Sequence, residues 1–553
     1  MIFNLNAPIT YTCDNRAPSL VRKVIQEEDW INYDEKIHYD CNFRWRTNTF
    51  DNRDYMQLWP DQFLNHHLQT NSITQKDILS RLVHSCHSIN KGIFNHYPKT
   101  YILPIDYSRF MIDARNPIIN NTSNYWIYKP AFSSRGRGIS ISNNLDQFID
   151  VPIKVKYKHK FNDPNRHVND LNYRYRFSEQ KLVHEHSTEK FHKLKQTNFI
   201  VQQYIKNPFL VNGYKLDLRL YVIVMSFTPL QIYINKTGLA RFATTKYNLN
   251  DLDNKYSHLT NTSINKKAFN CGKFTRCKWT LQQIRNYFKQ LNIDDSECFS
   301  RIIAIIIETI CLQATTMPKQ HSVELETAAT TNCFELYGFD IIIDKNMKPW
   351  LLEVNFSPSL VDECTVDKEV KIPLLKSIFR LIKYKCLEKR KQMHQKMYGY
   401  KRFEPRPYPK LKSINNTKIK KNENMDRMFN LTDTLNITDF KYPNLAHKKK
   451  VKGKIKYKKH SNIATFNTKI YPSKCVGTLY LVFPFNNITK INAKNINMKI
   501  IINECNRLVK FRNKICCKIK KFTDTNPNVY DKHQQHIFNT LMTSIENRLW
   551  LQR

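Results

Sequence analysis

Two carboxylates and one carboxamide occur close together in an otherwise apolar segment, 331–360; they belong to Asp340, Glu353 and Asn355. Buried carboxylates repel each other unless a cation lies between them. Oxygen ligands without His or Cys suit Mg²⁺, especially Mg²⁺ that is shared with phosphate groups. These three residues are therefore candidate magnesium ligands. The competing interpretation is a solvated hairpin whose acidic side chains face water.

The spacing of these residues depends on a predicted β-hairpin. Two apolar, β-rich runs, Phe334–Ile343 and Trp350–Val354, flank a polar break. A four-residue loop at 345–348 would place Asp340 directly opposite Glu353 on one face of the hairpin. Asn355 would project to the same face, because side chains alternate along a strand.

A second group of candidate residues surrounds a glycine-containing loop. Tyr125–Pro130 alternates and predicts a strand that ends near Lys129. The loop Ser133–Gly138 (SSRGRG) follows, and Ile139–Ser142 predicts another short strand. Backbone N–H groups and guanidinium groups in such a loop can bind phosphates. The alternative is an ordinary Arg-Gly turn with a lysine that reaches solvent.

A third group lies on one predicted strand, Gly213–Met225. Lys215, Asp217 and Arg219 alternate with leucines, so all three charges share one face. The row is either a solvated face with weak ion pairs, each worth about 0.5 kcal/mol, or the floor of a charged cleft.

Several further elements can be predicted around these groups. We expect a buried strand at Phe199–Tyr204, a helix capped at Thr280 and a core helix at about 296–313. The segments Leu239–Thr244 and Tyr256–Lys266 are polar enough to form loops of a cleft.

Composition indicates a protein with a packed core and reduced thiols. The 553 residues are 41% hydrophobic and 12% aromatic. No apolar run reaches the roughly 18 residues that a membrane span needs, since the nearest, Ile302–Ile310, is short and contains Glu308. No secretory signal is evident, and the 14 cysteines form no C-x-x-C motif. We therefore expect neither a zinc site nor a disulfide framework, and no contact with a membrane.

The net charge of +41 is concentrated near the C-terminus, where 401–553 holds 33 Lys and Arg against 9 Asp and Glu. Such a region favours an anionic polymer as partner: nucleic acid, a membrane surface or an acidic protein. The expected organisation, in chain order, is an N-terminal lobe at 1–100, a core at 101–395 with a surface insertion at 151–198, a basic low-complexity linker at 396–465 and a C-terminal extension of uncertain character at 466–553.

Five blocks carry a resemblance to a known family: WIYKPAFSSRGRGI, VQQYIKNPFLVNGYKLDLRLYV, GLARFAT, HLTNTSINK and CFELYGFDIIIDKNMKPWLLEVNFSPSL. In order and rough spacing they resemble the signature blocks of the tubulin–tyrosine-ligase-like amino-acid ligases, above all the polyglutamylase branch. The resemblance covers about residues 20–390. It implies an α/β (α+β) fold with an ATP-grasp core, followed here by a basic, partly disordered extension. The insertion at 151–198 is long for the family, and Leu216 stands where Phe is commoner.

The resemblance also implies an activity. Such enzymes use ATP and Mg²⁺ to phosphorylate a carboxylate on a tubulin tail, and the amine of a free amino acid then displaces the phosphate. The expected amino acid is glutamate, with glycine as the alternative within the family. The expected partners are the acidic tails of tubulin in microtubules, and the expected location is the cytoplasm and cytoskeleton, including the cilium or basal body.

Two other classes of function compete with this one. A non-catalytic microtubule-binding protein could retain the fold, but it would usually lose one of the charged positions that are intact here. A nucleic-acid binder is suggested by charge alone, and no recognisable reading element supports it.

The resemblance implies a role for each matching residue. Arg219 and Glu353 would be catalytic, and Arg219 would stabilise the transferred phosphoryl group. Asp340, Glu353 and Asn355 would bind Mg²⁺. The residues implied to bind the nucleotide are Lys129, Arg135, Gly136, Gln202, Gln203, Tyr204, Ile205, Lys215, Asp217, Thr260 and Asn261. The residues implied to hold the carboxylates of the incoming amino acid are Arg241, Ser263 and Lys266.

Overall fold

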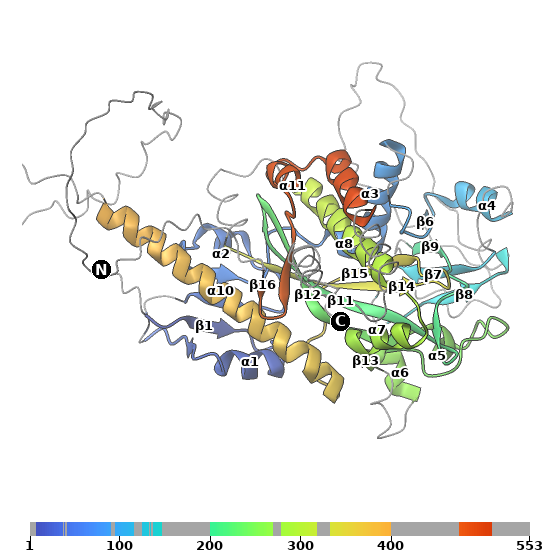
Figure 1. Cartoon of the computed structure of the whole chain (residues 1–553), viewed down its shortest axis with the longest axis horizontal. Coiled ribbons are helices and arrows are strands. Elements are labelled where there is room, and N and C mark those ends of the chain that lie inside the picture. Colours follow the sequence, from blue (N-terminus) through green and yellow to red (C-terminus); the bar gives the residue numbers. More distant parts are fainter. Residues whose placement is uncertain are drawn as a thin grey trace, which may run out of the picture. The chain divides into compact units, whose positions relative to one another are not determined.

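A computed structural model gives the fold of the chain (Figure 1). The chain divides into two compact units, residues 1–396 with 473–553, and residues 397–472. The predicted insertion at 151–198 and almost all of the predicted linker at 396–465 lie outside the described residues. The structure describes residues 7–36, 38, 41–89, 94–115, 124–131, 133, 136–145, 199–268, 278–317, 332–399 and 475–510.

The protein is of the α/β class, and its largest sheet has eight antiparallel strands (Figure 1). The strand order is β15-β14-β11-β12-β17-β16, with β10 beside β11 and β13 beside β12. The strands are β10 (Leu210–Val211), β11 (Tyr214–Phe227), β12 (Leu230–Phe242), β13 (Lys278–Thr280), β14 (Glu335–Ile343), β15 (Pro349–Phe356), β16 (Cys475–Val476) and β17 (Leu479–Phe483).

Two four-stranded sheets accompany the largest one. One is antiparallel, in the order β6-β9-β7-β8, and the other is parallel, in the order β2-β1-β3-β4. The antiparallel sheet comprises β6 (Thr100–Leu103), β7 (Trp126–Pro130), β8 (Ser140–Ser142) and β9 (Phe199–Gln203). The parallel sheet comprises β1 (Thr10–Cys13), β2 (Ile31–Asn32), β3 (Phe43–Trp45) and β4 (Phe63–Leu64).

Helices pack on both faces of the largest sheet. One face joins α7 and α8 in an apolar core, and the other joins α1 and α10 in a second core. The helices are α1 (Ser19–Gln26), α2 (Asn52–Met56), η1 (Ser72–Thr74), α3 (Lys76–Ile89), α4 (Tyr107–Arg115), α5 (Lys255–His258), α6 (Thr262–Ala268), α7 (Leu281–Gln290), α8 (Ser296–Thr316), α10 (Thr365–Gly399) and α11 (Asn487–Ile491), with further helical residues at 498–510.

Strand β11 shows how the sequence positions a charged surface inside this fold. Leu216, Leu218 and Leu220 on one face enter the core with α7 and α8. On the opposite face, Tyr221 and its alternate neighbours enter the core with α10. The charged residues at 215, 217 and 219 share that second face at the other end of the strand, because side chains alternate. The row is buried, so the solvated interpretation is wrong.

The predicted hairpin is present, and Asp340 lies opposite Glu353. The turn is longer than predicted, because Ile343 pairs with Pro349 and the loop is therefore 344–348. A β-bulge beside Asp340 compensates for this difference and restores the predicted pairing. Asp340 is only 2% exposed, so its carboxylate does not face water as the solvated-hairpin interpretation requires.

Two other predictions need correction. Leu239–Thr244 is not a loop, because most of it forms the end of β12, and Tyr256–Lys266 is largely helical, in α5 and α6. Part of the C-terminal extension, which the sequence left open, joins the core, since β17 pairs with β12. The core helix expected at about 296–313 is present as α8; by length and composition it could span a membrane, but 83% of its apolar window is buried inside the protein.

Candidate functional site

A cleft that opens onto about 850 Å³ of empty space lies beside the charged end of β11. Its walls come from the two antiparallel sheets, from the turn after β7 and from α3 and the segment around α5. Residues lining it are Lys76, Ile127, Lys129, Pro130, Ser133, Gly136, Arg137, Ile139, Gln202, Gln203, Tyr204, Ile205, Lys215, Asp217, His258, Leu259, Thr260, Asn261, Asp340, Ile342, Leu352 and Glu353.

The cleft brings together most residues that the sequence analysis singled out. The predicted residues that line it are Lys129, Gly136, Gln202, Gln203, Tyr204, Ile205, Lys215, Asp217, Thr260, Asn261, Asp340 and Glu353. Arg219, Arg241 and Asn355 do not line it, but each contacts Asp340. Arg135 lies outside the described residues, and Ser263 and Lys266 lie on α6.

Two buried lysines dominate one end of the cleft. Lys129, near the end of β7, donates a hydrogen bond to Gln202 Oε1 at 2.7 Å, and Lys215 donates to the Tyr204 hydroxyl at 2.8 Å. Among the described residues, these bonding partners are neutral rather than carboxylates. Burial lowers the pKa of Lys129 to about 8 and that of Lys215 to about 7, although nearby carboxylates oppose both shifts. An anion that entered the cleft would meet two lysine side chains whose hydrogen-bond partners, among the described residues, are neutral.

A network of two arginines and two aspartates, called here the charged floor, borders the cleft: the aspartates line it, and the arginines contact the aspartates. Arg219 binds Asp340 through Nε at 2.5 Å and Nη2 at 2.9 Å. Arg241 binds Asp217 at 2.5 Å and reaches Asp340 at 2.9 Å. Thr260 donates to Asp217 Oδ2 at 2.8 Å. Burial raises the pKa of Asp340, but the two arginines lower it more, so its carboxylate stays ionised.

A glycine makes room for this network. Gly338 lies on β14 directly opposite Asn355. A Cβ at this position would lie 3.2 Å from Arg219 Cδ and 2.8 Å from Pro358 Cβ, closer than side chains normally pack. The absence of a side chain therefore lets the Arg219 guanidinium lie against β14 and reach Asp340.

The three candidate metal ligands converge at the end of this floor. Asp340 pairs with Glu353 across the hairpin, and Asn355 Nδ2 lies 3.2 Å from Asp340 Oδ2. No group of three or more His, Cys, Asp or Glu side chains suited to a metal occurs in the part of the chain that the structure describes. The donor set here has two carboxylates and one carboxamide, and such oxygen ligands suit Mg²⁺ that keeps part of its shell for phosphate or water. The residues therefore fit that ion.

Lys76 is a cleft residue that the sequence analysis missed. It is the first residue of α3, and its ammonium donates to the Ser133 carbonyl at 2.9 Å and lies 3.7 Å from Glu353 Oε2. It thus connects the SSRGRG loop to a candidate metal ligand. His258 was also missed, and its Nδ1 lies 2.9 Å from the Tyr204 hydroxyl. No local pattern marks either residue, because the cleft assembles them from distant segments.

The residues predicted to hold an incoming amino acid are spread along the edge of the floor. Arg241 is buried between two aspartates, as described above. Lys266 forms an ion pair with Glu363 at 2.6 Å, and Glu363 also lies 3.4 Å from Lys278. Lys278 is the cross-strand partner of Arg241 on β13. These positions therefore alternate cationic and anionic groups, which is the charge pattern that a zwitterionic ligand requires.

The arrangement as a whole suits a polyphosphate. Buried cations at one end can neutralise phosphate oxygens, and carboxylates at the other can hold a divalent cation beside them. Gly136, with a φ of +72°, allows the loop backbone to turn beside Asn261. The geometry therefore supports nucleotide-dependent chemistry on a ligand at the Arg241 end.

Comparison with known proteins agrees with the resemblance. The model of the tubulin-tyrosine ligase family matches residues 53–393. A probable tubulin polyglutamylase TTLL2 from Homo sapiens is 36% identical over 385 residues, which cover 68% of this chain and 56% of that protein. Its Mus musculus counterpart is 34% identical, with 68% and 61% covered. A probable tubulin polyglutamylase TTLL9 from Bos taurus is 31% identical over 369 residues, with 64% and 75% covered.

The matched part spans less than two thirds of either TTLL2 relative. The family model, in contrast, covers well over half of the present chain and includes every candidate site residue described above. The chain belongs to the tubulin-tyrosine ligase family.

Proposed function

We propose that this protein is an ATP-dependent amino-acid ligase that adds glutamate to glutamate side-chain carboxylates on tubulin tails. The observation that carries the proposal is the gathering of two buried lysines, a charged floor and three oxygen ligands around a single cleft. In this proposal residues 101–395 form the central and C-terminal lobes of an ATP-grasp core, and residues 1–100 form its N-terminal lobe. The polyglutamylase names of the relatives support the choice of substrate.

Different residues of the cleft would bind different parts of ATP. Lys129 and Lys215 would bind its phosphates, together with Gly136 and Arg135. The segment 202–205 borders the base, with Thr260 and Asn261 beside the sugar and phosphates. Asp340, Glu353 and Asn355 would hold Mg²⁺, which when bound would supply positive charge for the phosphate oxygens.

The proposed reaction has two steps. An oxygen of the acceptor carboxylate attacks the terminal phosphorus of ATP, the bond to the bridging oxygen breaks, and ADP leaves an acyl phosphate behind. The amine of the incoming glutamate then attacks the acyl carbon, loses a proton, and expels inorganic phosphate as an amide bond forms. Arg219 would stabilise the transferred phosphoryl group, and Arg241, with Ser263 and Lys266, would hold the incoming carboxylates.

Tubulin tails are acidic, so a strongly basic protein suits them as a partner through long-range attraction. The basic segment 396–465 is proposed as a microtubule-binding region. The corresponding location is the cytoskeleton, including the cilium or basal body.

The test is incorporation of labelled glutamate and labelled glycine into purified microtubules, with and without ATP. The full-length protein is compared with Glu353→Gln, which removes a candidate metal ligand, and with Glu369→Gln, which changes an exposed residue of α10. We expect ATP-dependent glutamate uptake that Glu353→Gln abolishes and Glu369→Gln retains. Uptake of glycine alone would assign the protein to glycine ligation instead, and uptake of neither would refute a ligase function.

A further inference from the structure

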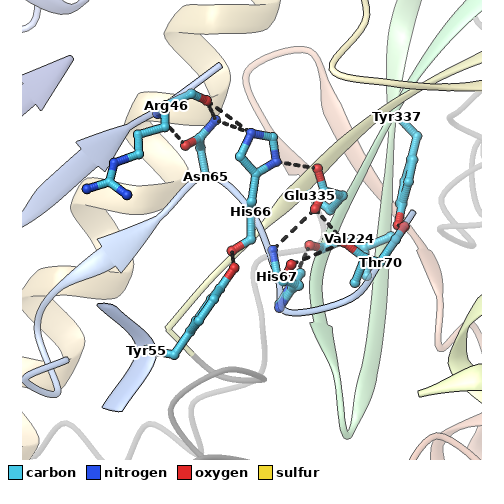
Figure 2. Close-up of polar contacts among 9 residues, drawn as sticks. All are labelled: Arg46, Tyr55, Asn65, His66, His67, Thr70, Val224, Glu335 and Tyr337. Carbon is cyan, nitrogen blue, oxygen red and sulfur yellow. Dashed lines mark hydrogen bonds and ion pairs between the residues drawn. The ribbon is translucent and has the colours of Figure 1, made fainter. Parts of the chain in front are cut away.

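A second polar network lies on the far side of the hairpin from the nucleotide end of the cleft. Figure 2 shows its centre, where His66 and Glu335 meet. His66 Nδ1 lies 2.8 Å from Glu335 Oε1, and both side chains are at most 2% exposed. The other carboxylate oxygen accepts from the Thr70 hydroxyl at 2.7 Å and from the His67 backbone N–H at 3.2 Å. A short loop of the N-terminal region is thereby bound to β14.

Three polar groups contact the His66 ring. Nδ1 faces the Glu335 carboxylate, and Nε2 lies 3.0 Å from the carbonyl oxygen of Arg46 and 3.1 Å from Nδ2 of Asn65. Nε2 thus has both an acceptor and a donor beside it, so these contacts suit the ring with a proton on Nδ1 alone as well as the doubly protonated ring. Burial lowers the pKa of His66, but Glu335 and the bond to Arg46 outweigh this effect and raise it. In both forms Nδ1 donates to Glu335, and the polar contacts hold the ring in one orientation.

This fixed ring packs against the end of β15. His66 stacks on Phe356 with ring centroids 4.8 Å apart and planes 20° from parallel. Phe356 is the last residue of β15 and directly follows Asn355, and the next residue, Ser357, has a φ of +47°. The strand therefore ends in a left-handed residue, a conformation that side chains rarely adopt, two positions after a candidate metal ligand.

Pairing between β14 and β15 links the contact of His66 with Phe356 to the position of Asn355. Phe356 pairs with Tyr337, whose hydroxyl donates to the Thr70 carbonyl at 2.6 Å (Figure 2). Asn355 Nδ2 lies 3.3 Å from the Gly338 carbonyl and 3.2 Å from Asp340. Movement of the strand end would therefore move the Asn355 carboxamide away from Asp340.

We propose that His66 is a positioning residue which, anchored by Glu335, holds the end of β15 so that Asn355 stays in place as a ligand for a divalent cation. The inference deepens the proposed function, since it depends on the cation site assigned there. His66 itself touches neither the cation nor the nucleotide. The N-terminal region thus contributes to the metal site without supplying a ligand.

His67 provides a matched control. It is as buried as His66 and adjoins it on the same loop, but its Nε2 lies 3.1 Å from the carbonyl of Val224 on β11, and its ring packs edge-on against Phe227. The hydrogen bond and the ring contact of its side chain are thus to β11. The variants His66→Leu and His67→Leu remove equivalent side chains, and only the first should disturb Asn355.

The experiment measures Mn²⁺ binding to the full-length protein by electron paramagnetic resonance in the presence of ADP. Affinity for ADP in the presence of EDTA is measured in parallel, with circular dichroism as the check of folding. We expect the dissociation constant for Mn²⁺ to rise about 10-fold in His66→Leu, near the lower end of the effect of residues that orient metal ligands. Metal-free ADP affinity should be unchanged, and His67→Leu should resemble the parent in both.

A second variant keeps the proposal testable if His66→Leu does not fold, because that change leaves the buried Glu335 without its His66 partner. Glu335→Gln keeps the stacked ring and one oxygen for the bonds from Thr70 and His67, and it removes the charge and the acceptor that faces His66. It should weaken Mn²⁺ binding in the same direction, by less.

Three results would overturn the inference. The first is a folded His66→Leu protein with parental Mn²⁺ affinity, and the second is a His66→Leu protein that loses Mn²⁺ affinity and metal-free ADP affinity equally. The third, where His66→Leu does not fold, is a folded Glu335→Gln protein with parental Mn²⁺ affinity. Mn²⁺ binding with the expected losses but without amino-acid ligation would refute the proposed function alone. A parent protein that binds no Mn²⁺ would refute the cation site and the inference with it.

Discussion

Nucleotide binding should draw protons from solution, because two lysines in the cleft are buried and, in the part of the chain that the structure describes, hydrogen-bond to neutral groups. Burial lowers the pKa of Lys215 to about 7 and that of Lys129 to about 8. At pH 8 both ammonium groups are therefore partly deprotonated in the free protein. Phosphate groups that bind beside them favour the charged forms and raise both pKa values, so protons move from the buffer to the protein.

The expected size of this uptake follows from the two pKa values. At pH 8 a group with a pKa of about 7 is about 90% neutral, and one with a pKa of about 8 is about 50% neutral. Full protonation in the complex would consequently take up about 0.9 proton at Lys215 and about 0.5 at Lys129. Phosphate oxygens have their own second pKa near 6, so they contribute little at pH 8.

Isothermal titration of Mg²⁺·ADP at pH 8 in buffers with different ionisation enthalpies measures this uptake directly. The parent should take up about 1.4 protons, Lys215→Met about 0.5 and Lys129→Met about 0.9. Lys255→Met, which changes an exposed residue that does not line the cleft, should match the parent. Tight binding with no proton uptake would show that the lysines are charged before the nucleotide arrives, and would refute the reasoning.

Three further substitutions test other parts of the structure. Gly136→Ala places a methyl group against Ile264 at a positive φ, so a strain of about 1 kcal/mol should weaken ADP binding several-fold in calorimetry; unchanged affinity would contradict the role of the turn. Lys76→Met should raise the KM for ATP but barely change the thermal midpoint, because its 3.7 Å ion pair with Glu353 is worth less than about 1 kcal/mol. Burial raises the pKa of Glu308 from 4.5 to about 8, so the folded protein retains a proton that the unfolded chain releases. The stability that this proton confers is present below pH 4.5 and is lost as pH rises to about 8, by up to about 1.4 kcal/mol per pH unit. In urea unfolding, the stability of Glu308→Gln relative to the parent should therefore increase between pH 5 and pH 8. A constant difference would exclude a buried neutral carboxyl.

Local patterns in the sequence were sufficient to predict the parts of the site that lie on one strand or one hairpin. Alternation along β11 placed Lys215, Asp217 and Arg219 on one face, and the structure buries that face in the floor of the cleft. The pairing of Asp340 with Glu353 was predicted correctly from a turn that is one residue too short. The bulge beside Asp340 offsets the error, and a bulge depends on packing between strands, which no alternation pattern reports.

Elements that need tertiary partners were predicted less well. The polar residues of Leu239–Thr244 predicted a loop. Strand β12 nevertheless continues into this segment, because β11 and β13 pair with it on both sides and form hydrogen bonds with its backbone. Lys76 and His66 carry no local signature at all. Each reaches the site from the N-terminal region, across more than 250 residues of sequence, to contact Glu353 or Glu335.

The charge balance of the free protein suggests which ligand the cleft accommodates most readily. Arg219 and Arg241 are already neutralised by Asp217 and Asp340 at 2.5–2.9 Å, so a carboxylate that approaches Arg241 must share or displace an existing partner. Among the described residues, the two buried lysines hydrogen-bond to neutral groups, and their ammonium ions are costly without an anion. Electrostatics therefore favours phosphate binding first. A cation that binds Asp340 beside the phosphates would then compete with the arginines for that carboxylate, and would leave a guanidinium free for the amino acid whose ligation we propose.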